Sequence, residues 1–294
     1  MGSPIPVTYG GQAVIEGVLM RSNTAYAIAA RRPDGTIKVL YQEMEARAVS
    51  SPVWRLPILR GMATLAEMVV LGMRAISWSA GVQLGEDVEI PPAAMGLTIA
   101  GSALFAVLLF VVLPFLVARG VSHSTSLASV LLEGLIRLLV LVVYLLLIGM
   151  IGSVGRLFQY HGAEHKAING LEAGAVLEAE AVTGCSRLHP RCGTGFLVVV
   201  VVVSVIVFSP LTLLPIWERF LGELVLLPLV AGISYEGIRF LGRHRYASWA
   251  KVGLMPILGA QLLTTREPST PQIEVAIAAL ARVLPSGATE LSVP

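Results

Sequence analysis

The segment YHGAEHKAING, residues 160–170, gathers two histidines and a glutamate in a chain with few charged residues. His161, Glu164 and His165 form the pattern H-x-x-E-H, and on a helix these three residues share one face. Two imidazoles placed in this way can hold one metal ion, with the carboxylate near a metal-bound water. The order matches the inverzincin motif, the reverse of the zincin motif. The pattern predicts a helix over residues 156–168, a metal site, and Glu164 as the general base.

Two histidines do not complete a zinc site, which takes three protein ligands when it is catalytic and four when it is structural. A second segment, CSRLHPRCGTGF, offers Cys185, His189 and Cys192 just before a long apolar run. We predict that Zn²⁺, or another divalent transition metal, binds to four side chains from the two segments. These are His161, His165, His189 and Cys192. Such an ion fits either an enzyme or a structural clasp that holds a loop against the membrane.

Other charged residues in apolar surroundings have two interpretations each. The third ligand of an inverzincin site is an acidic residue further along the chain, and Glu223 and Glu236 are candidates. Glu133 and Arg137 are spaced i, i+4 in an apolar segment. They could line a path through the membrane, or they could neutralise each other near the outer end of a helix.

The composition indicates a membrane protein, because 55% of the 294 residues are hydrophobic and only 14% are charged, against about 25% charged in soluble domains. The net charge of +2 gives no reason to expect nucleic acid as a partner. The two cysteines are too few for a disulfide framework, so we expect them to be reduced or metal-bound. The first residues lack the pattern of a cleaved signal peptide.

Four apolar segments are long enough to cross a bilayer core of about 30 Å. They are residues 96–118, 128–152, 196–217 and 219–240. Short loops join the first to the second and the third to the fourth, which predicts an α-helical integral membrane protein with about four transmembrane helices in two hairpins. A further apolar segment, residues 57–80, contains Arg60, Glu67 and Arg74. These charges favour an interfacial or re-entrant helix, and a fifth transmembrane span is the alternative.

The distribution of lysine and arginine predicts the orientation in the membrane. Basic residues are frequent before the first span, between the second and third spans and after the fourth, whereas the two hairpin loops carry only Arg119 and Arg219. Both termini and the histidine loop are therefore expected in the cytoplasm, in a multi-pass protein of the bacterial inner membrane. His123 lies in a hairpin loop and is expected in solvent, as is His244. The run 243–245, Arg-His-Arg, is typical of a lipid headgroup contact.

The soluble parts flank the spans. AYAIAARRPDGTIKVLYQEM predicts two strands around the turn PDG, and QAVIEGVLMRS predicts a third. Glycines around that third strand permit close backbone approach to a strand or a ligand. Near the other end, PSTPQIEVAIAALARVL predicts a helix capped by Ser269 or Thr270 and started by Pro271.

The predicted organisation has six parts. They are a cytoplasmic β-rich region at 1–50, an interfacial or re-entrant helix at 51–95, a first transmembrane hairpin at 96–152, a cytoplasmic His/Cys metal-site loop at 153–195, a second transmembrane hairpin at 196–240, and a basic C-terminal cytoplasmic segment with an amphipathic helix at 241–294.

Four motifs in order, GGQAVIEGVLMR, YHGAEHKAI, HPRCGTGF and LTTREP followed by QIEVAIAAL, resemble the YqhQ-like family of bacterial membrane proteins. The resemblance covers nearly the whole chain. That family is uncharacterised and is described as a predicted metal-dependent enzyme. The matching positions in this sequence are His161, Glu164, His165, His189 and Cys192. Cys185 lies outside the matching part, so it ranks below Cys192.

Two functional hypotheses follow. The first is a metal-dependent hydrolase at the cytoplasmic face of the membrane, such as a peptidase, with Glu164 catalytic. The second is a non-enzymatic scaffold or membrane-protein biogenesis factor whose metal is structural, which would act through a protein partner. A transporter ranks third, because the sequence indicates no broken-helix pair and no paired carboxylates within the spans. The lipid bilayer is the expected partner in every case.

Overall fold

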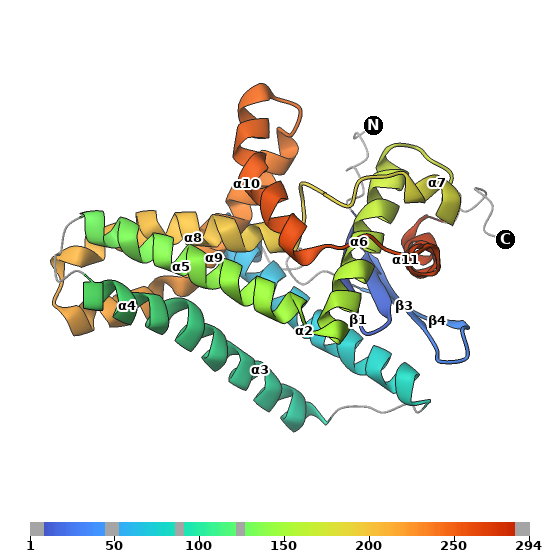
Figure 1. Cartoon of the computed structure of the whole chain (residues 1–294), viewed down its shortest axis with the longest axis horizontal. Coiled ribbons are helices and arrows are strands. Elements are labelled where there is room, and N and C mark those ends of the chain that lie inside the picture. Colours follow the sequence, from blue (N-terminus) through green and yellow to red (C-terminus); the bar gives the residue numbers. More distant parts are fainter. Residues whose placement is uncertain (1–8, 45–52, 86–90, 122–126, 286–294) are drawn as a thin grey trace.

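A computed structural model describes residues 9–44, 53–85, 91–121 and 127–285 (Figure 1). Long apolar helices form a bundle at one end of the molecule, and a small sheet covered by helices lies at the other end. The predicted position of His123 in solvent lies outside the described residues.

The sheet is antiparallel, with its four strands in chain order. The strands are β1 (Gly10–Val14), β2 (Gly17–Arg21), β3 (Ala25–Arg31) and β4 (Ile37–Glu43). The hairpin around PDG agrees with the sequence prediction. The prediction of a single strand before it was wrong, because the backbone of Glu16 turns back with a φ of 51° and Val14 then pairs with Gly17.

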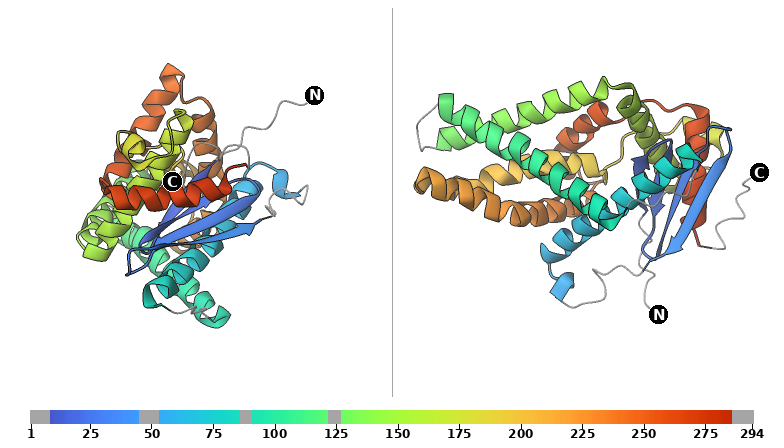
Figure 2. Two further views of the ribbon diagram at one scale, coloured as in Figure 1. Left: turned by 90° about the vertical axis from the view of Figure 1, so that its right-hand side faces the viewer. Right: turned by 90° about the horizontal axis from the view of Figure 1, so that it is seen from below.

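Helices cover both faces of the sheet (Figure 2). Because side chains alternate along a strand, Val18 and Met20 face one side, towards α6 (Gly152–Glu172) and α11 (Thr270–Val283). Val14, Leu19 and Ile28 face the other side, towards α2 (Leu59–Leu84). The predicted cap of α11 is present, since Ser269 and Gln272 form a capping box.

The bundle contains the four apolar segments expected from the sequence. Its elements are α3 (Pro92–Val107), η2 (Leu108–Val112), α4 (Leu113–Val121), α5 (Leu127–Gly149), α8 (Gly193–Phe208), η3 (Ser209–Leu213) and α9 (Ile216–Arg243). The first three form one helix from 92 to 121, and η2 is a π-helical turn just before Pro114, which has no N–H to donate to the helix. Among the described residues, five helices are long and apolar enough to cross a membrane, one more than expected, and the additional one is α2.

Three further helices complete the fold. Two are short, η1 (Val53–Arg55) and α7 (Ala179–Thr183). The third, α10 (Ser248–Thr264), was not predicted from the sequence and lies in the segment 241–294, to which only one amphipathic helix was assigned. In Figure 1 it projects across the direction of the bundle helices.

Four buried charged residues form a closed ring inside the bundle, a feature that the sequence interpretation missed. Arg137 Nη2 lies 2.7 Å from Glu133 Oε1 and 3.4 Å from Glu223 Oε2. Arg219 completes the ring, since its Nε donates to Glu223 Oε1 over 3.1 Å and its Nη2 contacts Glu133. Ser204 on α8 also accepts a hydrogen bond from Arg137, so the ring joins three helices.

This ring corrects two earlier inferences. Arg219 was assigned to a hairpin loop, but it is buried on α9. One of the two grounds given against transport was the absence of paired carboxylates within the spans, yet Glu133 and Glu223 share both arginines. Because each charge has opposite charges beside it, the ring as a whole is neutral, and the Glu133–Arg137 pair is part of a larger network.

Candidate metal centre

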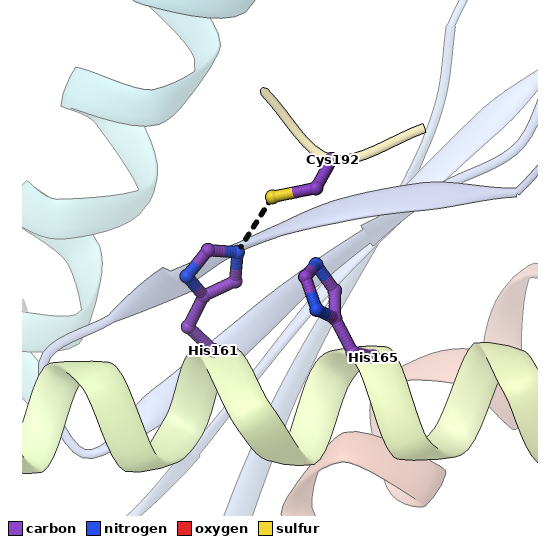
Figure 3. Close-up of side chains that lie close together, drawn as sticks. All are labelled: His161, His165 and Cys192. Carbon is purple, nitrogen blue, oxygen red and sulfur yellow. Dashed lines mark hydrogen bonds between the residues drawn. The ribbon is translucent and has the colours of Figure 1, made fainter. Parts of the chain in front are cut away.

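Helix α6 presents His161 and His165 on one side, and Figure 3 shows both imidazoles projecting from it towards Cys192. The helix is longer than the predicted 156–168, because Asn169 does not end it. The Asn169 side chain instead donates to the carbonyl oxygens of Ser186 and Leu188, which ties α6 to the loop that carries Cys192.

Cys192 completes a group of three candidate ligands. It caps the N-terminus of α8, where its Sγ accepts from the backbone N–H of Thr194 over 3.3 Å. Its Sγ lies 3.2 Å from His161 Nε2. Ligand atoms of His161, His165 and Cys192 all lie within 4.8 Å of one another. Zinc bonds of about 2.0–2.3 Å place two ligands of one tetrahedral ion about 3.3–3.7 Å apart. The His161–Cys192 separation is close to this range, and the outer limit of 4.8 Å is about 1 Å wider than one ion requires.

Backbone carbonyls orient both imidazoles of the group. His161 Nδ1 lies 2.9 Å from the carbonyl oxygen of Thr264, and His165 Nδ1 lies 2.6 Å from that of Arg187. A carbonyl oxygen can only accept, so each Nδ1 carries the proton. Each Nε2 then keeps its lone pair for a metal. A hydrogen bond from the other ring nitrogen to a carbonyl oxygen is usual for a histidine that binds a metal.

His189 lies beside the group but outside it. Its ring centre is 5.9 Å from that of His165. Its Nδ1 accepts a long hydrogen bond of 3.4 Å from the backbone of Arg191. Its Nε2 is buried, has no hydrogen-bond partner among the described residues, and lies 3.6 Å from Glu172 Oε1. Burial lowers the pKa of His189 to about 4, so the ring is neutral at neutral pH.

Glu164 is buried below the group, with Oε2 4.0 Å from His161 Nε2. Burial raises the pKa of this carboxyl, while the nearby histidines and the backbone N–H of Gly11 act in the opposite direction. A raised pKa suits a general base, whose best value lies near the working pH. Position 11 needs glycine for this close approach, because a Cβ there would lie 3.0 Å from Glu164 Cγ and only 2.4 Å from the Leu19 carbonyl oxygen. The close approach expected of the N-terminal glycines is thus made both to a strand and to a site residue.

The end of α10 and the residue that follows it, Thr265, contribute contacts to which the sequence interpretation gave no role. Gln261 is fully buried and brackets His189, accepting from its N–H over 2.9 Å and donating to its carbonyl oxygen over 2.8 Å. Thr265 accepts from Arg187, whose own carbonyl orients His165. Gln261 could have been noticed in the sequence, because it is a polar residue within an apolar run. The contacts made by backbone carbonyl oxygens could not, because they do not depend on the type of side chain.

The other candidate residues lie away from the group. Cys185 is half-buried and does not join it. Glu223 belongs to the buried ring, and Glu236 on α9 pairs with Arg60 on α2. His244 is exposed, as predicted, and its ring stacks on Phe240 at 4.6 Å.

Comparisons with known proteins agree with the resemblance seen in the motifs. Residues 56–286 match the family described as "Protein of unknown function (DUF1385)". The chain is 34% identical over 289 residues to the "Uncharacterized protein YqhQ" of Bacillus subtilis (strain 168), covering 93% of this chain and 91% of that protein. No solved structure matches the chain.

Proposed function

This chain belongs to the DUF1385 family of unknown function, and we propose that it is a metal-dependent hydrolase embedded in the bacterial inner membrane, with its metal centre at the cytoplasmic face. The ion is Zn²⁺ or another divalent transition metal, because mixed imidazole and thiolate ligands suit such ions. Its protein ligands are His161, His165 and Cys192, and Glu164 is the general base.

One observation carries the proposal, namely that three ligand atoms converge while the fourth candidate does not. Three protein ligands leave a position for water, which is the arrangement of catalytic zinc sites, whereas structural sites are closed by four. When bound, the metal would lower the pKa of its water towards 7. Glu164 lies on the same face of α6 as both histidines, with Oε2 4.0 Å from His161 Nε2, so it would be placed to act as the base for such a water.

The packing of the sheet supports four spans over five. The sheet, α6 and α11 share one hydrophobic core, so they lie on the same side of any membrane. The chain between β4 and α6 must then cross an even number of times. Of its candidates, α2 packs against the sheet, which leaves α3–α4 and α5 as the crossing pair. The same reasoning pairs α8 with α9 between α6 and α11.

A topology experiment tests this arrangement in intact cells. An impermeant thiol reagent should leave Cys192 unmodified and should modify a cysteine introduced as Ser122→Cys or Ser124→Cys, because the first hairpin loop faces the outside. The matched position is Ser3→Cys, expected to be protected until the cells are permeabilised. Labelling of that cysteine from outside would show that the N-terminus is external and would rule out the four-span topology.

Metal content tests the centre itself. Purified protein should contain about one equivalent of metal by elemental analysis, because the three ligands bind one ion. The double variant His161→Ala, His165→Ala should lose it, whereas His244→Ala, which changes an exposed histidine outside the site, should keep it. Full metal content in the double variant would place the ion elsewhere. The variant His189→Ala then distinguishes two ligand sets. Metal should be retained if three side chains bind the ion, and lost if His189 is the fourth ligand predicted from the sequence.

The alternative is a scaffold or biogenesis factor with a structural metal. The Nε2 of His189 favours it, because this atom is buried and has no hydrogen-bond partner among the described residues. Rotation of the ring towards His165, with transfer of the Nε2 proton to Nδ1, would supply a fourth ligand and close the site. Loss of metal from His189→Ala would support this alternative.

A further inference from the structure

We propose that α10 and the turn before it form a surface element that inserts into the headgroup layer of the bilayer and binds acidic phospholipids. The turn comprises residues 244–247, between α9 and α10. This inference concerns the membrane surface beside the metal centre and does not depend on the reaction proposed there.

The outer face of α10 is apolar and uncovered. Trp249, Val252 and Met255 are 52%, 67% and 68% exposed, and Leu262 further along is 54% exposed. The opposite face is buried and contacts α8, where a Cβ on Gly195 would lie 2.3 Å from Ile257 Cγ2. A helix with one packed face and one exposed apolar face needs an apolar environment on its outer side.

The direction of α10 places that outer face along a membrane surface. The helix projects across the bundle in Figure 1, and the left view of Figure 2 shows the same projection from the end of the molecule. It is attached where α9 ends, on the side of the bundle that faces α6 and the sheet. An apolar helix in this position lies in the plane of the interface.

The basic and aromatic side chains beside this face indicate that lipid covers it. Arg243, His244 and Lys251 are exposed at this end of α10. Tyr246 is 79% exposed, and the rings of Phe240, His244 and Trp249 pack against one another at tilted angles. Aromatic rings prefer the level of the headgroups, and basic side chains beside them attract acidic lipids. Arg245 is already engaged by Glu172 and is not counted.

Fluorescence of a single tryptophan in reconstituted protein tests the insertion. The full-length chain is used with Trp54→Phe, Trp78→Phe and Trp217→Phe, which leaves Trp249. In vesicles of brominated phosphatidylcholine, Trp249 should lose at least half of its emission, and aqueous acrylamide should quench it weakly. The matched control keeps only Trp78, which packs against the sheet and should be insensitive to bromine.

Two results would overturn the proposal. Strong quenching by acrylamide without quenching by bromine would place Trp249 in water. Protection from both quenchers would mean that protein, a partner or a second copy, covers α10. Acidic lipid is tested with a small fraction of brominated phosphatidylglycerol in unbrominated phosphatidylcholine. The variant Arg243→Gln, Lys251→Gln should weaken the preference for phosphatidylglycerol about fivefold per charge removed, and an unchanged preference would refute the acidic-lipid part.

Discussion

Replacing Glu164 by glutamine is expected to leave the metal bound and to slow the reaction about 10²- to 10⁴-fold, the usual effect of removing a positioned general base. Glutamine has nearly the same shape, and its carboxamide oxygen can still accept from the N–H of Gly11. It cannot take a proton from a metal-bound water. The change should therefore affect the rate of the proposed reaction without affecting metal binding.

Two measurements check this result. Cobalt-substituted protein should keep its thiolate-to-metal absorption band in Glu164→Gln, because Cys192 still binds, but its pH-dependent change of spectrum should shift or disappear. In cells, the variant should fail to complement a strain that lacks the gene, although it accumulates normally. In a structural clasp, Glu164 would instead support the ligands, and its loss would weaken metal binding about 10- to 100-fold. Full metal content together with full complementation would remove the case for an enzyme.

Breaking the buried ring is expected to cost about 3–5 kcal/mol of stability, because removal of one partner leaves an uncompensated charge in a medium that cannot solvate it. Glu223→Gln is the suitable change, since Glu223 is fully buried and contacts both arginines. Unfolding by denaturing detergent from mixed micelles measures the effect. Glu218→Gln on the same helix is the control, because Glu218 is exposed and should change stability little.

A double variant shows whether pairing causes the loss. Arg219→Met, Glu223→Met removes one charge of each sign and leaves the Glu133–Arg137 pair intact. It should recover most of the stability lost in Glu223→Gln, since buried ion pairs can be replaced by apolar side chains at little cost. If the double variant is as unstable as the single one, the loss of stability comes from altered packing around Glu223 and not from an unbalanced charge.

The sequence predicted the elements whose signals are local. Four apolar segments, the PDG hairpin and the cap at Ser269 depend on neighbouring residues and agree with the structure. Two failures have physical reasons. Glu16 adopts a left-handed backbone conformation that its residue type does not favour, so the turn between β1 and β2 was missed. Helix α10 contains Pro256 and is apolar on both sides, so it has no periodic pattern to reveal it.

The same distinction applies to the candidate site. The pattern of His161 and His165 on a helix, with Cys192 in the next segment, could be read from residue types, and the structure brings these three together. The different position of His189 could not, because it depends on Gln261 from a distant helix. The ring was also hidden, since it joins residues of α5 and α9 that are far apart in the sequence.

Gly11 and Thr264 come from opposite parts of the chain, yet both contact the side chains of α6. This sets a limit on when the site can exist during biosynthesis. A ribosome makes the histidines and Cys192 well before it reaches Thr264, so a nascent chain holds the three candidate ligands before His161 has the carbonyl that orients it. The Thr264 carbonyl oxygen reaches His161 only after α10 has been made. A chain that ends before Thr264 therefore lacks the carbonyl oxygen that orients His161, so its candidate ligands are not held as they are in the complete fold.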